Sequence, residues 1–254
     1  MLVRGVARST LPFYSPLKGA HMDLRLTSAL EMLASGLSGP VSAAADIGCD
    51  HGKLSLALLE NDLAQQVIAS DISPASLEKA MALASQEGLS DRLICRTSDG
   101  FSAYSEGEVQ CAVICGMGGE LIASILEKGS RIAHSLECIV MQPMRGEAEL
   151  REYLYTHSYR ITDDRVVLDG GRYYQLIAAK AGTPLPLPYG WPVGYYQFGA
   201  EAYRKNDELL VPMLKRYLGI MNRKLASCEV EPLALMREKE CTEMILGMIE
   251  EKNR

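Results

Sequence analysis

Asp46-Ile47-Gly48-Cys49-Asp50-His51-Gly52 has the composition of a buried strand that turns sharply into a helix. The small apolar run at 42–45 precedes it, and residues 53–60 follow with the apolar spacing of a helix packed on a sheet. Gly48 allows a tight turn or the close approach of a ligand, because it has no Cβ. Free N–H groups at the start of the helix face whatever lies over the turn. The stretch therefore predicts a nucleotide-cofactor site.

A carboxylate at the end of the next predicted strand narrows the choice of cofactor. Residues 67–70 are apolar or small, and Asp71 follows them. In doubly wound folds, a carboxylate at this place accepts hydrogen bonds from a ribose diol. Gly48 and Gly52 do not form the G-x-G-x-x-G pattern that brings the backbone against a pyrophosphate. These features favour S-adenosylmethionine, and the alternative is a tight turn in an α/β core beside a solvated aspartate.

Composition indicates an ordinary intracellular enzyme. The chain has 254 residues, enough for one α/β domain and a smaller appendage, and no apolar run approaches the roughly 18 residues that span a bilayer. Its seven cysteines form no C-x-x-C pair, so we expect reduced thiols, no metal and a cytoplasmic location. The formal net charge of −6 argues against a general polyanion binder but leaves room for a local basic face.

Apolar patterning becomes regular after Asp23, with an amphipathic helix over 24–37 and then alternating strands and helices. We predict strands at 43–47, 67–71, 92–97, 109–114 and 137–141, and helices at 53–61, 74–87, 119–128 and 147–157. Such alternation predicts a parallel sheet with helices on both faces. Two antiparallel strands follow, 159–168 and 173–179, joined by Asp169-Gly170-Gly171-Arg172, a good hairpin turn. The fold class is α/β, with the Rossmann-like sheet of a class I methyltransferase.

We divide the chain into three parts. Residues 1–21 lack a sustained apolar period, and we expect either a disordered extension or a tag remnant with a misassigned start. Residues 22–182 form the predicted S-adenosylmethionine-dependent methyltransferase domain. Residues 183–254 form a small C-terminal domain, in which helices at about 197–226 and 232–252 pair as an antiparallel, coiled-coil-like hairpin.

Three further turns fall at predicted strand ends. Asp99-Gly100 follows the third strand, where Asp99 either accepts a hydrogen bond from an adenine amino group or only caps its turn. Gly116-Met117-Gly118-Gly119 follows the fourth strand, and its glycines indicate that a ligand or a neighbouring segment approaches the backbone closely. Gln142-Pro143 closes the fifth strand, where Gln142 is placed to bond a base edge or to belong to a plain loop.

Taken in order, these motifs resemble the TrmK-like family of bacterial tRNA (adenine-N1)-methyltransferases. The resemblance covers about Asp23 to Ala181 and extends more loosely through the C-terminal helices. It implies an S-adenosylmethionine-dependent enzyme that modifies N1 of the adenine at position 22 of tRNA. The cofactor site then consists of Asp46, Gly48, Cys49, Asp50, Gly52, Asp71, Ile72, Asp99, Gly100, Gly116 and Met117.

Two positions depart from the family pattern. Met144 follows Gln142-Pro143 where the family usually has asparagine, and Gln175 follows Tyr174 where the family often has glutamate. Both departures bear on the target nucleotide more than on the use of the cofactor.

Asp50, His51 and Gln142 are the candidate catalytic residues. Adenine N1 carries an in-plane lone pair and its methylated product is cationic, so positioning the reactants supplies most of the acceleration. Negative or dipolar groups beside the base then stabilise the developing positive charge, and Asp50 and His51 lie in the first turn beyond the cofactor loop. The alternative is that Asp50 caps the helix and His51 orients a neighbour.

Positive charge on the first C-terminal helix predicts the RNA-binding surface, since phosphate contacts position an RNA without reading its sequence. The candidate residues are Arg204, Lys205, Lys215, Arg216, Arg223 and Lys224. The alternative is a solvated face on a hairpin used for dimerisation. We expect a monomer or weak homodimer, with tRNA as partner and without a membrane. A methyltransferase of the same fold that acts on a small molecule or protein is the alternative function, and a non-catalytic RNA-binding module is a third.

Overall fold

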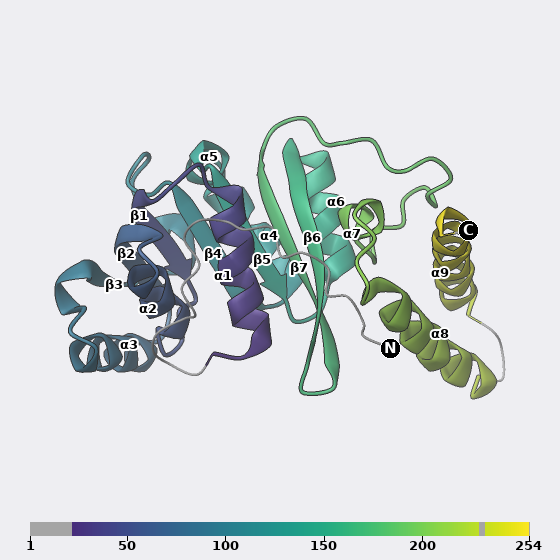
Figure 1. Cartoon of the computed structure of the whole chain (residues 1–254), viewed down its shortest axis with the longest axis horizontal. Coiled ribbons are helices and arrows are strands. Elements are labelled where there is room, and N and C mark those ends of the chain that lie inside the picture. Colours follow the sequence, from purple (N-terminus) through teal and green to yellow (C-terminus); the bar gives the residue numbers. More distant parts are fainter. Residues whose placement is uncertain (1–21, 229–231, 254) are drawn as a thin grey trace, which may run out of the picture.

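The computed structural model of the chain describes residues 22–228 and 232–253. Its centre is a seven-stranded sheet with the order β3-β2-β1-β4-β5-β7-β6 (Figure 1). The strands are β1 (Val41–Ile47), β2 (Ala64–Asp71), β3 (Leu93–Thr97), β4 (Cys111–Met117), β5 (Cys138–Pro143), β6 (Tyr159–Asp169) and β7 (Arg172–Ala181). All seven predicted strands are present, and the predicted α/β fold class is confirmed.

Strands β1 to β5 are parallel, and β7 is antiparallel to both β5 and β6. Chain order reverses between β1 and β4, which lie side by side with β2 and β3 on one flank and β5 on the other. In open α/β sheets, ligands bind outside the carboxyl ends of the strands at this reversal point. The topology therefore assigns the ligand site to the loops that follow β1, β2 and β4.

Helices cover both faces of the sheet. One face packs on α1 (Leu24–Gly36), α2 (Lys53–Glu60) and α3 (Pro74–Gln86). The other packs on α4 (Gly119–Lys128), α5 (Ser130–Ser135) and α6 (Glu147–Thr156). The short helix α5 and the 3₁₀ turns η1 (Ser90–Arg92) and η2 (Phe101–Ala103) have no counterpart in the sequence prediction. Alternate residues of β1 enter the two cores, as expected for a sheet buried on both sides.

Local chemistry fixes several element ends. The Asp23 side chain accepts a hydrogen bond from the Leu26 N–H at 2.8 Å and so caps α1. Ser73 caps α3, whose first residue is Pro74. Gly170 and Gly171 have φ angles of 54° and 76°, which allow the tight turn between β6 and β7. The predicted hairpin is confirmed, with Asp169 paired to Arg172.

The C-terminal segment contains α7 (Ala200–Arg204), α8 (Leu210–Ala226) and α9 (Leu233–Lys252). The prediction of one helix over 197–226 is wrong, because the chain leaves helical geometry at Asn206, whose φ is 57°. Asp207 stabilises the break, since its carboxylate accepts hydrogen bonds from the Leu209 N–H and the Val166 N–H, each at 2.9 Å. The break could not be predicted, because the spacing of apolar residues continues across it.

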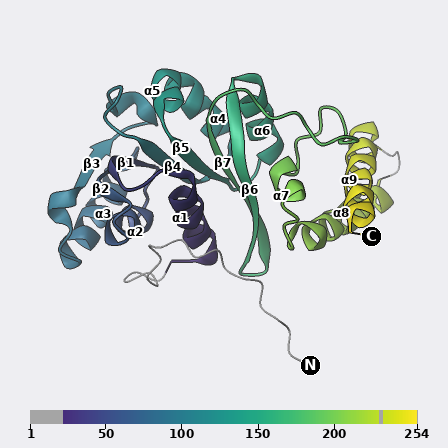
Figure 2. The ribbon, with the colours of Figure 1, turned by 45° about the horizontal axis from the view of Figure 1, so that its top comes forward.

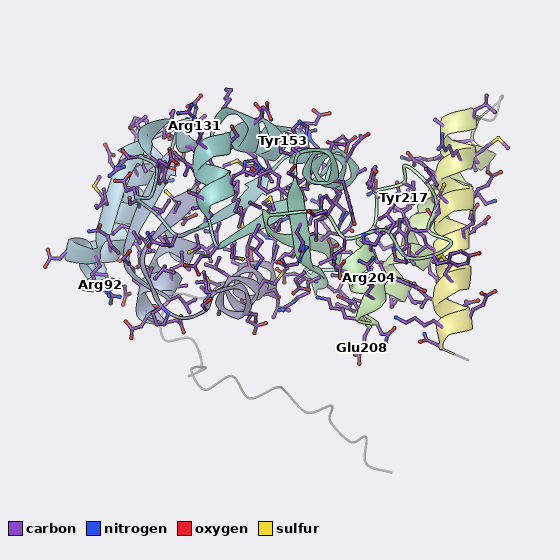
Figure 3. All side chains as sticks on the ribbon, turned by 90° about the horizontal axis from the view of Figure 1, so that it is seen from above. Arg92, Arg131, Tyr153, Arg204, Glu208 and Tyr217 are labelled. Atoms are coloured by element: carbon purple, nitrogen blue, oxygen red, sulfur yellow. The ribbon has the colours of Figure 1, made fainter. Side chains whose placement is uncertain are left out.

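Helices α8 and α9 lie side by side beyond one edge of the sheet (Figures 1 and 2). Tyr217 of α8, labelled in Figure 3, donates a hydrogen bond to Glu238 of α9 at 3.2 Å. The helices share a core with Val166 of β6 and Tyr173 of β7. The helical hairpin therefore rests on the β6–β7 hairpin.

The sequence prediction for residues 1–21 lies outside the described part of the chain. Within residues 22–228 and 232–253, none of the helices is long and apolar enough to cross a membrane.

Candidate active site

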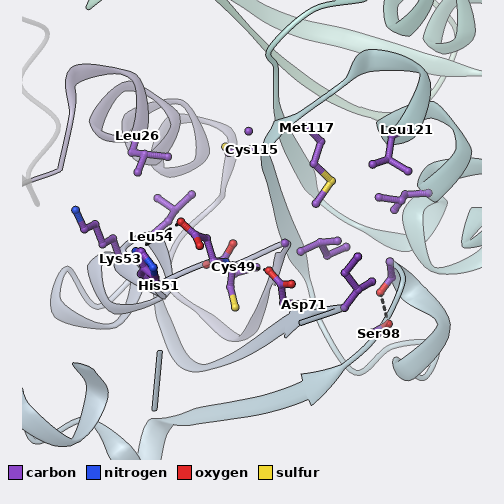
Figure 4. Close-up of a pocket in the computed structure, with 18 of the residues that line it drawn as sticks. Leu26, Cys49, His51, Lys53, Leu54, Asp71, Ser98, Cys115, Met117 and Leu121 are labelled. Atoms are coloured by element: carbon purple, nitrogen blue, oxygen red, sulfur yellow. Dashed lines mark hydrogen bonds and ion pairs between the residues drawn. The ribbon is translucent and has the colours of Figure 1, made fainter. Parts of the chain in front are cut away.

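A cavity of about 700 Å³ opens at the carboxyl ends of the central parallel strands (Figure 4). This volume falls within the range of about 300–1,000 Å³ that small-molecule sites occupy. The loops after β1, β2, β3 and β4 line it, together with the first turn of α1. Of the expected cofactor residues, those in the cavity wall are Asp46, Gly48, Cys49, Asp50, Asp71, Ile72, Asp99, Gly100, Gly116 and Met117. His51 also lines it.

The loop after β1 is held in a conformation that favours glycine. Gly48 has a φ of 72°, and a Cβ at this position would overlap the Met117 methyl group in the cavity wall. The Gly48 and Cys49 N–H groups donate to the Ser70 carbonyl at 2.7 and 3.0 Å, which fastens the loop to β2. Gly48 therefore presents bare backbone to the cavity, as the sequence predicted.

Gly52 has a structural role and does not line the cavity. Its φ is 73°, and a Cβ there would lie 2.7 Å from the Cβ of Ala80 on α3. Its placement among the cofactor-contacting residues is corrected here, because its small size serves the packing of α2 against α3.

Asp71 lies at the end of β2 with its carboxylate fixed by the backbone. One oxygen accepts a hydrogen bond from the Asp50 N–H at 3.2 Å, and the other accepts one from the Ser73 N–H at 2.8 Å. A carboxylate oxygen has two lone pairs, so both oxygens retain acceptor capacity. Ile72, which is 73% exposed, adds an apolar surface beside this carboxylate. The pair has the chemistry to hold a ribose diol next to a flat ring.

Asp46 is a buried carboxylate at the floor of the cavity. Its side chain accepts a hydrogen bond from the Ser55 hydroxyl at 2.5 Å. Burial raises the pKa of Asp46 to about 6, the hydrogen bonds from Ser55 oppose the rise, and the charge of Asp71 adds to it. Asp46 thus costs the folded protein free energy when it ionises.

Replacing Asp46 with asparagine is expected to remove a pH dependence of folding. A raised pKa in the folded state makes the protonated acid stabilising at low pH, and this stability is lost as pH rises through about 6. A shift of about two units corresponds to roughly 3 kcal/mol at most. Urea unfolding is measured at pH 5 and pH 8 without added ligand. The free energy of unfolding of Asp46→Asn, relative to that of the wild type, should be higher at pH 8 than at pH 5. A constant difference between the two proteins would contradict the assignment.

Asp50 and His51 form a polar corner of the cavity wall. Asp50 has a φ of 47° and a side chain that is 74% exposed. The His51 Nε2 atom lies 2.9 Å from the Lys79 ammonium nitrogen. An ammonium group only donates, so Nε2 is the acceptor and the ring proton resides on Nδ1, which faces the Asp50 carboxylate at 3.7 Å. The corner presents an oriented imidazole and a negative charge to the cavity.

Gln142 is fully buried and lies behind the cavity wall. Its carbonyl oxygen accepts hydrogen bonds from Arg25 at 2.5 Å and from the Gly116 N–H at 3.3 Å. Its amide nitrogen donates to the Pro143 carbonyl at 2.6 Å and contacts the Met144 sulfur at 3.7 Å. The amide is therefore engaged within the protein, and the prediction that Gln142 bonds a base edge is corrected to a role in holding Arg25 and the loop after β4.

Arg25 is a charged residue of the cavity wall that the sequence analysis did not include in the site. It lies in the first turn of α1, lines the cavity, and pairs with Asp23 at 3.1 Å. A charged residue early in a predicted helix was visible in the sequence. Its relevance was not, because only the packing of α1 across the sheet brings that turn to the carboxyl ends of β4 and β5.

Asp99 and the glycine-rich loop complete the wall. The Ser102 hydroxyl donates to Asp99 at 2.6 Å and, with the nearby Lys128 ammonium, holds the pKa of Asp99 below its ordinary value. A Cβ on Gly119 would overlap the Gly146 carbonyl oxygen. Gly119 therefore allows the backbone at Gly146 to approach the start of α4 closely.

The six cations predicted to bind RNA are not equivalent. Arg204 contacts Glu201 and the Pro186 carbonyl, and Lys205 pairs with Asp163. Arg216 donates to the Gly171 carbonyl at 2.7 Å. Lys215, Arg223 and Lys224, like Arg216, are exposed on α8. Among the residues that the structure describes, no group of three or more His, Cys, Asp or Glu side chains is arranged to hold a metal ion.

The strand order, the antiparallel β7 and a cavity at the reversal point of the sheet together define a class I methyltransferase. A family model described as "Methyltransferase domain" matches residues 23–177. Over 161 residues the chain is 32% identical to the tRNA (adenine(22)-N(1))-methyltransferase of Bacillus subtilis (strain 168), and the match covers 63% of this chain and 67% of that protein. The chain belongs to the TrmK-like family of bacterial tRNA methyltransferases, and the resemblance seen in its motifs is confirmed.

Two solved structures share the whole architecture. B. subtilis TrmK, described as an m1A22 tRNA methyltransferase, has a TM-score of 0.72 at 23% identity and matches 91% of this chain and 98% of its own. M. capricolum TrmK in complex with S-adenosyl-homocysteine has a TM-score of 0.74 at 21% identity and matches 90% and 98%. At these identities the likeness extends the fold to the C-terminal helices and no further.

Proposed function

We propose that this protein transfers a methyl group from S-adenosylmethionine to N1 of an adenine in tRNA, the adenine at position 22. The observation that carries the proposal is the cavity at the reversal point of the sheet, with Asp71 at the end of β2 and bare backbone at Gly48. The name of the B. subtilis relative supplies the target nucleotide, and the bound product of the M. capricolum relative supports the cofactor.

The residues in the wall fit this cofactor. Asp71 is the acceptor for the ribose hydroxyls, and Ile72 offers an apolar surface to the adenine ring. Asp99 is the candidate acceptor for the adenine amino group. Gly48 leaves room for the chain of the ligand where any side chain would meet Met117. When bound, the cofactor supplies an electrophilic methyl group on a sulfonium.

The corner formed by Asp50 and His51 is the proposed catalytic element. Adenine gains positive charge as its N1 accepts the methyl group, and a carboxylate beside the base stabilises that charge. His51, with its proton on Nδ1, directs an N–H toward the Asp50 carboxylate, 3.7 Å away. Both residues also keep the base in line with the methyl group, which is the larger part of the acceleration.

Alanine at Asp50 or at His51 is expected to lower turnover about tenfold, which corresponds to about 1.4 kcal/mol of lost transition-state stabilisation. Cofactor affinity should stay near the wild-type value, because the backbone N–H of Asp50, and not its side chain, contacts Asp71. Single-turnover methylation and calorimetry with the cofactor separate the two effects. Asp91→Ala, an exposed aspartate in η1, is the control. A loss confined to cofactor binding would make both residues cofactor ligands.

The RNA surface in this proposal combines the two parts of the chain. Residues 22–182 hold the cofactor and the target base, and residues 183–254 contact the RNA through the exposed Lys215, Arg223 and Lys224 of α8. We further propose that the protein acts in the cytoplasm, as a monomer or weak homodimer.

The direct test is methylation of tRNA with labelled cofactor. We expect 1-methyladenosine in digests of unmodified tRNA and none when the adenine at position 22 is replaced. Label in another nucleoside, or at another position, would overturn the target. Methyl transfer to a small molecule or protein without any transfer to tRNA would favour the alternative methyltransferase.

A further inference from the structure

Two guanidinium groups face the ring of Tyr174, and one of them belongs to a residue of the cavity wall. The Cζ atoms of Arg25 and Arg172 lie 5.6 and 5.2 Å from the ring centroid. Arg25 lines the cavity, whereas Arg172 is exposed at the start of β7 and donates to the Met144 carbonyl at 2.8 Å. Tyr174 therefore connects the cavity wall to the tip of the β6–β7 hairpin and holds the plane of Arg172.

Two more exposed arginines adjoin this tip. Arg145 follows Met144 in the loop after β5 and is exposed. Arg216 of α8 donates to the Gly171 carbonyl and lies with its Cζ 5.8 Å from the Tyr173 ring centroid. Residues Arg145, Arg172 and Arg216 are called the arginine rim below. The rim extends from the loop after β5, over the hairpin tip, to α8.

The charge of the rim has no internal counterpart in the described part of the chain. No carboxylate there lies within 4.0 Å of the guanidinium groups of Arg145, Arg172 or Arg216. By contrast, Arg92, Arg96 and Arg151 each pair with an acid. The guanidinium groups of Arg172 and Arg216 are unneutralised and are held by protein carbonyls and tyrosine rings. They are therefore preorganised to bind an anion through parallel N–H groups, and phosphate is a usual ligand of this kind.

We propose that the arginine rim binds the phosphodiester groups on either side of the nucleotide that enters the cavity. The proposal rests on the proposed function, since it takes tRNA as the partner, and it places RNA contacts on the methyltransferase sheet as well as on α8. Arg172 shares the Tyr174 ring with Arg25 of the cavity wall, and Arg216 continues the path toward the exposed cations of α8. The fixed planes of these side chains also suit the stacking of an extruded base.

The test is charge reversal at the rim, with Arg172→Glu and the double variant Arg145→Glu, Arg172→Glu. Lys180→Glu is the matched control, because Lys180 is exposed on the same strand, at the end opposite Arg172. Affinity for unmodified tRNA is measured at 50 and 200 mM salt, together with cofactor affinity and the rate of methylation. Arg172→Lys, which keeps the charge and loses the planar group, is the conservative variant.

We expect each rim reversal to weaken tRNA binding about tenfold or more and to flatten the plot of log affinity against log salt by roughly 0.7–0.9 per lost contact. The rim variants should keep the wild-type affinity for the cofactor, and Lys180→Glu should bind tRNA like the wild type. The tRNA affinity of Arg172→Lys should fall between those of the wild type and Arg172→Glu. If the wild type methylates tRNA and the rim variants keep its affinity and slope, the rim proposal is wrong and the proposed function stands. If the wild type neither binds nor methylates tRNA, both are wrong.

Discussion

Replacing Arg151 with methionine is expected to lower the free energy of unfolding by about 3–5 kcal/mol. Arg151 is 2% exposed and donates to Asp164 at 2.8 and 3.1 Å and to Gln175 at 3.0 Å. It also donates to the Tyr196 and Gln197 carbonyls at 3.2 and 3.1 Å. Methionine fills similar space but leaves Asp164 buried without its cation. Urea unfolding of the two proteins at pH 7 measures the loss.

Two variants make this prediction specific. Arg151→Met with Asp164→Leu removes both charges and should recover part of the loss, because the uncompensated carboxylate is gone. The Gln175 side-chain oxygen and the Tyr196 carbonyl still lose their donor in the double variant. Burial raises the pKa of Asp164 and the Arg151 charge opposes this, as expected for such a pair. Arg165→Met breaks the partly exposed pairs with Glu31 and Asp163 and should cost about 1 kcal/mol or less. Equal losses from Arg151→Met and Arg165→Met would show that the buried network contributes nothing beyond a surface pair.

The buried network also has an architectural role. Arg151 lies on α6 and Asp164 on β6, while Tyr196 and Gln197 precede α7. The side chain thus ties the sheet to the segment that leads into the C-terminal helices. Because the helices also share a core with Val166 and Tyr173, we expect deletion of the C-terminal segment to expose the β6–β7 hairpin. Point variants are therefore sounder tests of RNA binding than truncation.

The elements that could be predicted from the sequence are those with local causes. The strands and most helices follow from apolar periodicity, and the β6–β7 turn follows from Gly170 and Gly171. The cofactor loop was visible because a small apolar run, Gly48 and the strand-end Asp71 each have a local signature. Fixed topology then brings these residues to one edge of the sheet, which is why ten of the eleven expected cofactor residues line the cavity.

The features that could not be predicted depend on contacts between distant residues. Arg25 belongs to the site because α1 packs across the sheet. Gln142, which was predicted to contact the base, does not line the cavity, because its oxygen is bonded to Arg25 and the Gly116 N–H. Asp207 ends a helix by bonding to Val166 on β6, a contact with no local pattern. The cations of the C-terminal segment were grouped by sequence alone, whereas Lys205 is occupied by Asp163.

Replacing Asp71 with alanine is expected to weaken S-adenosylmethionine binding by about 1–3 kcal/mol, or roughly 5- to 150-fold. The change removes the acceptor proposed for the ribose diol and also frees the Asp50 and Ser73 N–H groups that the carboxylate holds. Both losses disorder the wall of the cavity at the point where β2 ends. Calorimetry with the cofactor, at a protein concentration near its dissociation constant, measures the change directly.

Asp71→Asn separates the two contributions, because an amide keeps one acceptor oxygen while it loses the charge and the second acceptor. Its affinity should fall between the wild type and Asp71→Ala. Asp91→Ala, which removes an exposed aspartate from η1, controls for a change in net charge and should bind like the wild type. If Asp71→Ala binds the cofactor with wild-type affinity and its fold is intact by unfolding measurements, the ribose does not bind at the end of β2. The ribose would then have to lie elsewhere in the cavity, for example toward the charged pair of Arg25 and Asp23 in its wall.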